Sequence, residues 1–310
     1  MRLVSYGVDG ALRAGILFDD MVVDADAAAQ ATGLVGIDTQ ARWTSLRQFF
    51  ALDVDGLRRI DTAARALVAE QTMPEHVRLL ADVRLSPPIL DPEKIICLGL
   101  NYREHAAEAH LETPVAPMLF AKFCNSLIGP ADPIVLPRIS TQIDYEGELA
   151  VVIGRTCKEV AVRDALDYVA GVMAFNDVSA RDLQMQTSQW MAGKALDTFA
   201  PCGPALVLLD EIPEIQNLTL TTRVNDMVVQ QANTSAMIFP VRETVSFLSR
   251  LMTLQPGDII ATGTPAGVGF QRQPPFYLQA GDVVEVEIER IGMIRNRVVR
   301  PEIQEEIPRS

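Results

Sequence analysis

The chain has 310 residues, 48% hydrophobic and 22% charged, which is the composition of a folded globular protein with one large or two modest domains. Its 40 acidic and 27 basic residues give a net charge of −13, which argues against a protein that binds the phosphate backbone of nucleic acids. Four scattered cysteines and three histidines argue against a disulfide framework and a histidine-rich zinc centre, so a metal is expected to bind oxygen ligands.

The amino-terminal segment has no feature of a secretion signal or a membrane anchor. Charged residues interrupt residues 1–20 before any long apolar run develops. No stretch elsewhere approaches the roughly 18 uncharged apolar residues of a membrane-spanning helix. We therefore expect a cytoplasmic protein that does not contact a membrane.

The first 80 residues are predicted to form a small domain that combines strands with helix. Apolar residues recur every three or four positions across residues 43–70, with charges between them, which indicates an amphipathic helix. A group of prolines follows, and we place the domain boundary between residues 75 and 92. Three short strands are expected before the helix, at Leu3–Tyr6, Ala14–Phe18 and Met21–Asp24.

Residues 92–302 are predicted to form a larger domain that is mostly β with some α, an α+β class. Its one long helical pattern covers Val241–Leu251. Asn225 and Asp226 separate two alternating runs and predict a hairpin turn. The expected strands are Ile95–Leu98, Ala150–Gly154, Gly171–Phe175, Leu218–Val224, Met227–Gln230, Asp258–Thr262 and Asp282–Ile288.

Three carboxylates stand near the ends of predicted buried strands. Glu146 and Glu148 project from the same face, because side chains alternate along a strand. Either both face water or a cation holds them together, and hard oxygen ligands suit Mg²⁺, Mn²⁺ or Ca²⁺. Asp177, which follows another apolar run, is either a third ligand or the N-cap of a helix that begins near Ser179.

His105 and Glu108 are three residues apart, so on a helix they share a face. A carboxylate beside an imidazole orients the ring and stabilises its protonated form, as a general base requires. The alternative is an ordinary surface pair that contributes little stability. His110 has no such neighbour and is expected at the surface.

Two lysines and one glycine-rich loop are further candidates for a site. Lys122 and Lys194 each stand alone in apolar surroundings, either at the edge of the core or as anchors for a substrate carboxylate. The loop of residues 262–269 lacks the GK[ST] ending of a phosphate loop. We interpret it as a turn that lines a pocket, with the Thr264 hydroxyl available to a substrate.

Five segments of the larger predicted domain follow one another in a recognisable order. They are Gly99–Tyr102 with His105, Asp144–Leu149, Asn176–Gln184, Gly193-Lys194 with Asp197–Pro201, and Thr262–Pro265 with Gly267–Gly269. In this order the segments resemble the fumarylacetoacetate hydrolase family, with its fumarylacetoacetase C-terminal fold, over roughly residues 93–300. One departure is that Ala195-Leu196 stand where many members carry Ser-Phe after the lysine. The hairpin turn Asn225-Asp226 also replaces the more common Asn-Gly.

The resemblance implies a distorted β-roll catalytic domain, a small N-terminal domain and a homodimer. It assigns the ligands of a Mg²⁺ or Mn²⁺ ion to Glu146, Glu148 and Asp177. It makes His105, on a mobile lid segment, the base that activates a water while paired with Glu108. It makes Lys194 a catalytic residue that contacts the substrate and the oxygens on the metal side, and it places Gln184 and Thr264 in the pocket for a small diketo or keto acid. We expect Lys122 to be a further contact to this substrate.

The function implied by the resemblance is metal-dependent hydrolysis of a C–C bond in an acylpyruvate or fumarylpyruvate-type β-diketo acid from aromatic catabolism. A divalent cation stabilises the enolate that leaves in such a reaction. The same charge stabilisation serves a decarboxylase or a keto–enol isomerase acting on oxaloacetate or 5-oxopent-3-ene-1,2,5-tricarboxylate, or a lyase acting on a ureido or sugar acid. A further alternative is a non-catalytic dimer that the metal stabilises.

Overall fold

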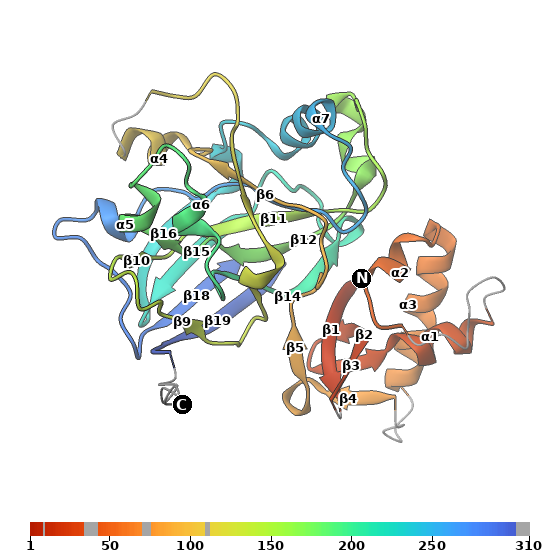
Figure 1. The fold of residues 1–310 in the computed structure, drawn as a ribbon. Helices are drawn as coiled ribbons and strands as arrows, with labels where there is room; N and C mark the ends of the chain where they lie inside the picture. Colours follow the sequence, from red (N-terminus) through yellow and green to blue (C-terminus); the bar gives the residue numbers. More distant parts are fainter. Residues whose placement is uncertain (9, 34–42, 70–75, 109–111, 302–310) are drawn as a thin grey trace, which may run out of the picture.

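The structure, a computed structural model, describes residues 1–8, 10–33, 43–69, 76–108 and 112–301 (Figure 1). The prediction for His110 lies outside these residues. None of the helices in the described ranges combines the length and the apolar character that crossing a bilayer requires. Strands outnumber helices, which confirms the predicted α+β class.

The largest sheet contains twelve strands within the described residues. Ten of them follow one another in the order β4-β3-β2-β1-β14-β12-β11-β17-β6-β7, while β5 pairs with β1 and β8 pairs with β14. Their bounds are β1 (Arg2–Val8), β2 (Ala11–Phe18), β3 (Met21–Asp24), β4 (Val77–Leu79), β5 (Arg84–Ser86), β6 (Ile95–Gly99), β7 (Met118–Lys122), β8 (Leu127–Ile128), β11 (Gly147–Ile153), β12 (Val169–Asn176), β14 (Ala200–Leu208) and β17 (Ile259–Ala261).

This sheet continues from the N-terminal part of the chain into the rest of it. The strand β1 pairs with β2 on one side and with β14 on the other, where Leu3 faces Leu206. The sheet therefore runs across the predicted boundary between residues 75 and 92. Figure 1 shows the N-terminal strands and helices, in red and orange, at the side opposite to α4 (Arg103–Glu108), α5 (Arg181–Gln184) and α6 (Met191–Lys194). The division into domains of residues 1–80 and 92–302 stays a prediction.

Two smaller sheets complete the β structure. The prediction of a hairpin is confirmed, and its turn residues Asn225 and Asp226 have φ values of 50° and 67°, as a tight turn between twisted strands requires. One sheet has the order β16 (Met227–Asn233), β15 (Thr219–Val224), β18 (Val283–Ile288), β19 (Gly292–Val299) and β9 (Ile134–Val135), and the other pairs β10 (Ile143–Asp144) with β13 (Ser179–Ala180).

Most of the helices in the described residues are short. The predicted helix over residues 43–70 is divided in two, because Asp53 accepts a hydrogen bond from the Gly56 amide and starts a new helix there. The α-helices are α1 (Ala25–Thr32), α2 (Arg47–Phe50), α3 (Val54–Ala69), α4 (Arg103–Glu108), α5 (Arg181–Gln184), α6 (Met191–Lys194) and α7 (Val241–Leu251). The 3₁₀ segments are η1 (Leu80–Asp82), η2 (Cys124–Ser126), η3 (Val162–Tyr168), η4 (Leu209–Glu211), η5 (Thr234–Ala236) and η6 (Gly269–Gln271).

Several elements were not predicted, and the reasons are local. The helix α1 begins immediately after a strand, where the Asp24 side chain accepts a hydrogen bond from the Asp26 amide and acts as its N-cap. The strands β7, β14 and β19 were also missed, since their sequences alternate only in part between apolar and polar residues.

Candidate active site

The start of β11 and the end of β12 lie side by side because these two strands are antiparallel, with Gly147 facing Asn176. This register brings Asp177, which follows β12, to Glu146 and Glu148. One oxygen of each of the three carboxylates lies within 4.8 Å of the others. Among the described residues, this is the one group of three or more His, Cys, Asp or Glu side chains with the spacing of a metal site.

The alternative interpretations of these carboxylates are wrong. Glu146 is 6% exposed, and Glu148 and Asp177 are fully buried, so the two glutamates do not face water. Asp177 does not cap a helix either, since α5 begins four residues later and has Ala180 at its N-cap position. Three carboxylates have therefore been taken out of water, and such groups need positive charge nearby.

Lysines provide part of that charge. The Lys194 ammonium lies 2.7 Å from Glu146 Oε2 and 2.6 Å from Asp177 Oδ2. The Lys122 ammonium lies 2.6 Å from Asp177 Oδ1 and also donates to the Val178 carbonyl at 3.1 Å. Both lysines are about as buried as the carboxylates they contact. Lys194, at the end of α6, therefore bridges two of the three candidate ligands.

Arg181 is a further cation of the site, and only its position in the family motif could have indicated it from the sequence. Its Nη2 lies 2.7 Å from Glu146 Oε1 and 2.8 Å from Asp144 Oδ2. Burial alone raises the pKa of Glu146, but Lys194 and Arg181 outweigh it and lower that pKa to about 2. Glu146 is therefore held in its ionised form.

Glu148 is the carboxylate that these cations leave uncompensated. Its Oε2 accepts a hydrogen bond from the Gly263 amide at 2.9 Å, while its Oε1 has no hydrogen-bond partner among the described residues. Burial, Asp177 and Glu146 together raise the pKa of Glu148 well above its ordinary range. The buried cluster holds four carboxylates and three cationic side chains, namely Asp144, Glu146, Glu148 and Asp177 with Lys122, Arg181 and Lys194.

A divalent cation fits this group. The buried cluster has one carboxylate more than it has cations, and Oε1 of Glu148 has no hydrogen-bond partner among the described residues. A hard cation such as Mg²⁺ or Mn²⁺, which prefers carboxylate oxygens, would balance this charge and bind that oxygen. Glu146, Glu148 and Asp177 would hold it.

Gly147 stands between the two glutamates at a point where strand β15 approaches β11 closely. A Cβ atom at this position would lie 2.1 Å from Thr222 Oγ1, which is itself buried. We expect Gly147→Ala to push the start of β11 away from β15, displace both glutamates and weaken Mn²⁺ binding by about 10–100-fold. Calorimetric titration with Mn²⁺ measures this change.

Gly7→Ala is the matched control for this prediction. A Cβ at Gly7 meets one backbone oxygen, of Arg84, at the ordinary distance of 3.9 Å. This variant should bind Mn²⁺ like the original chain. Unchanged affinity in the Gly147→Ala variant would contradict the view that backbone packing holds the ligands in place.

The predicted pair of His105 and Glu108 is present on α4. Their Nδ1 and Oε2 atoms are 3.4 Å apart. His105 is only 7% exposed, so this is not a surface pair. Both Glu108 oxygens also accept a hydrogen bond from the Gly267 amide at 3.1 Å, and this contact joins α4 to the glycine-rich loop. The carboxylate therefore holds the imidazole from one side and the loop from the other.

His105 and Glu146, one of the three carboxylates, line the same small cavity of about 80 Å³. Gln184 and Thr264 are among the residues that line this cavity, and their contact with a substrate stays a prediction. Lys122 is not among its lining residues, so we assign it to holding Asp177 rather than to substrate contact. The lining residues are Leu98, Gly99, Leu100, His105, Phe120, Glu146, Arg181, Gln184, Met185, Trp190, Lys194, Thr264 and Phe270.

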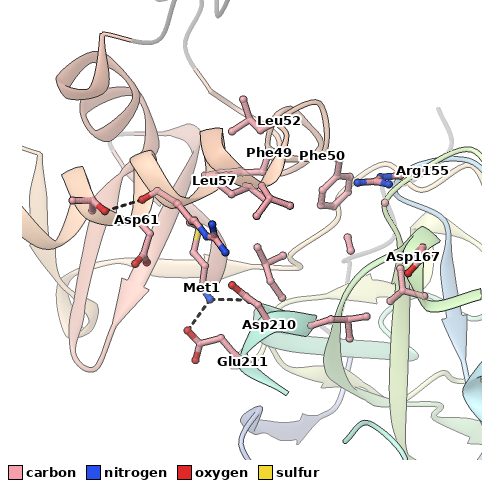
Figure 2. Close-up of a pocket in the computed structure, with 18 residues that line it drawn as sticks. Met1, Phe49, Phe50, Leu52, Leu57, Asp61, Arg155, Asp167, Asp210 and Glu211 are labelled. Atoms are coloured by element: carbon pink, nitrogen blue, oxygen red, sulfur yellow. Dashed lines mark hydrogen bonds and ion pairs between the residues drawn. The ribbon is translucent and has the colours of Figure 1, made fainter. Parts of the chain in front are cut away.

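A larger cavity of about 560 Å³ lies elsewhere, between α2, α3 and the ends of β12 and β14 (Figure 2). Phe49, Phe50 and Leu57 form an apolar wall, and Arg155 lies beside Phe50. Side chains of both charge signs share its rim, and none belongs to the carboxylate group. The residues that line this larger cavity do not form a recognisable catalytic group, so the smaller cavity is the candidate active site.

Comparison with known proteins agrees with the geometry. Over residues 94–299 the chain matches the family described as fumarylacetoacetate (FAA) hydrolase, C-terminal. It is 44% identical over 256 residues to the protein of Xenopus laevis named oxaloacetate tautomerase fahd2, mitochondrial, which covers 82% of this chain and 78% of that protein. It is 51% identical over 221 residues to an uncharacterized protein of Archaeoglobus fulgidus, which covers 71% and 84%.

Solved structures agree as well. The fumarylacetoacetate hydrolase of Exiguobacterium antarcticum superposes with a TM-score of 0.78 at 35% identity, covering 97% of this chain and all of that one. The maleylpyruvate hydrolase of a Sphingobium species gives a TM-score of 0.76 at 32% identity, with 97% and 100% coverage. The chain belongs to the fumarylacetoacetate hydrolase family.

Proposed function

We propose that the protein is a metal-dependent tautomerase that interconverts the keto and enol forms of an oxaloacetate-type 2-keto dicarboxylic acid. The observation that carries the proposal is a buried group of three carboxylates, one of which, Glu146, lines the same cavity as His105. Relatives from Xenopus laevis and Rattus norvegicus that are 44% and 45% identical are named oxaloacetate tautomerases, which supports this substrate class. We propose Mg²⁺ or Mn²⁺ as the ion.

The dimensions of the cavity support a small substrate. Its volume of about 80 Å³ and its wall of Phe120, Trp190 and Phe270 leave little room beyond a four-carbon acid. The rings of Phe120 and Trp190 lie 5.6 Å apart in an edge-to-face arrangement, which fixes that wall. A longer acylpyruvate would have to extend beyond this wall.

The chemistry assigned to the chain is the movement of one proton. His105 Nδ1 faces Glu108, so the other ring nitrogen, Nε2, is the atom assigned to the substrate. It takes a proton from C3 of the keto acid, the C–H electrons form the C2–C3 double bond, and the proton returns to the oxygen on C2. Glu108 holds the ring and stabilises the imidazolium that forms in between.

Charge in the cavity determines which substrate enters. When bound, a divalent cation supplies a Lewis acid that stabilises negative charge on the 2-keto oxygen. Lys194 and Arg181 also line the cavity, and their charges offset those of the buried carboxylates. An acidic substrate is therefore compatible with a chain of net charge −13.

Hydrolysis of an acylpyruvate is the second candidate. The similarity to a solved maleylpyruvate hydrolase favours it, as does a base placed to activate water. Both reactions place negative charge on the same enol oxygen, so the family alone does not choose between them.

Stopped-flow absorbance of enol oxaloacetate tests the proposal. We expect the protein with Mg²⁺ to accelerate interconversion beyond Mg²⁺ alone, a chelator to remove the effect, and His105→Asn to reduce it by about 100-fold. His76→Asn, outside the cavity lining, is the control. If the protein cleaves an acylpyruvate to pyruvate and has no effect on oxaloacetate, the tautomerase proposal is wrong and the hydrolase is the function.

A further inference from the structure

The loop of residues 262–269 contacts both halves of the active site. Near its start, the Gly263 amide donates to Glu148, one of the candidate metal ligands, at 2.9 Å. Near its end, the Gly267 amide donates to Glu108, which holds His105. The conformation of this one loop therefore sets the position of the base relative to the carboxylate group.

Gly267 occupies a position that only glycine tolerates. Its φ is +103°, and a Cβ atom there would lie 2.2 Å from the Val229 carbonyl oxygen. Its own carbonyl oxygen accepts hydrogen bonds from Tyr145 Oη at 3.0 Å and Arg272 Nε at 3.3 Å. The residue is thus packed against β16 on one side and bound through its carbonyl on the other.

The guanidinium of Arg272 donates hydrogen bonds to this loop and to the neighbouring strand β16. Its Nη2 donates to the Val229 carbonyl at 2.7 Å, and its Nε also lies 3.2 Å from Tyr145 Oη. Within the described residues, this half-buried guanidinium forms no salt bridge to a carboxylate. Its geometry ties the Gly267 carbonyl to β16 and leaves the Gly267 amide directed at Glu108.

We propose that Arg272 is a positioning residue for the His105–Glu108 pair. It acts through the Gly267 backbone, because it does not line the cavity and its hydrogen bonds go to Tyr145, Gly267 and Val229 rather than to His105 or Glu108. Tyr145 assists it as the second donor to the same carbonyl. The proposal rests on the proposed function in taking His105 as the base.

Kinetics of tautomerisation separate this role from a merely structural one. Arg272→Met should lower kcat by about tenfold with little change in KM, because substrate contacts remain while the base is misoriented. Arg272→Lys should restore part of kcat, and Tyr145→Phe should show a smaller loss of the same kind. Arg223→Met, which removes an arginine paired with Glu287 on the neighbouring strands, should keep both constants.

A double-mutant cycle tests the route through Glu108. If Arg272 acts by orienting Glu108, Arg272→Met should cost little once Glu108→Gln is in place. Additive losses in the double variant would overturn the proposal. An equal rise of KM and fall of kcat in Arg272→Met alone would overturn it too, as would a loss of the folded state in Arg272→Lys.

Histidine NMR provides a readout that does not depend on turnover. The chain has three histidines, so the ring signals of His105 can be assigned by their disappearance in His105→Asn. Arg272→Met and Glu108→Gln should both shift these signals in the same direction, and Arg223→Met should not. If the His105 signals shift in Arg272→Met but the parent protein has no tautomerase activity, the positioning role is upheld and the proposed function is refuted. If the His105 signals do not shift in Arg272→Met, the positioning role is refuted.

Discussion

Replacing Glu148 by glutamine should abolish cation-dependent turnover. The substitution keeps the shape of the side chain but removes a ligand charge, and a loss of several kcal/mol of charge stabilisation corresponds to a fall of about a thousandfold in kcat/KM. The protein without metal should at the same time melt at a higher temperature than the parent. Glu148 is a buried carboxylate whose Oε1 has no hydrogen-bond partner among the described residues, so neutralising it removes a cost of folding.

Thermal melting with Mg²⁺ and with a chelator checks both effects. The parent should gain stability from Mg²⁺ by mass action, and Glu148→Gln should gain almost none. Glu287→Gln is the matched control, because this glutamate pairs with Arg223 at the surface of the smaller sheet. A variant that retains Mg²⁺-dependent turnover would exclude Glu148 as a ligand.

Replacing Lys194 by methionine should have the largest effect on stability. Its ammonium bridges Glu146 and Asp177 at 2.7 and 2.6 Å in a buried site. Removing one partner of a buried ion pair leaves uncompensated charge and costs about 3–5 kcal/mol. Mg²⁺ should recover part of this loss, because a divalent cation neutralises the same two carboxylates. Urea unfolding with and without Mg²⁺ measures the free energy.

Lys94→Met provides a control of the same kind at a distance from the site. Lys94 pairs at 3.0 Å with Asp258, which is fully buried. Lys94→Met should lower the free energy of unfolding, but Mg²⁺ should not recover the lost stability. Equal recovery in both variants would mean that the cation stabilises the protein elsewhere. No recovery in Lys194→Met would mean that the cation does not bind Glu146 and Asp177.

Patterns that depend on neighbouring residues predicted much of the site. Strand alternation places Glu146 and Glu148 on one face, and helical spacing places His105 beside Glu108. Both arrangements occur in the structure. The helix at Val241–Leu251 and the hairpin at Asn225-Asp226 were predicted for the same reason, since turn chemistry and periodicity act over a few residues.

Contacts between distant residues were beyond such patterns. Asp177 joins the glutamates only through the register of β11 against β12, and Arg181 reaches Glu146 from a separate helix. Lys122 and Lys194 have similar apolar surroundings in the sequence, yet only Lys194 lines the cavity. Their difference comes from the pairing of β7 with β6, which buries Lys122 behind Asp177.

A crystal structure with Mn²⁺ and oxalate, a mimic of the planar enol acid, tests the central claim most directly. The anomalous signal of manganese would locate the ion without reference to any assumed ligand. We expect a peak about 2.1 Å from one oxygen each of Glu146, Glu148 and Asp177, with oxalate between the ion and His105. A peak at any other group of residues, or none at these three while oxalate occupies the cavity, would contradict the account.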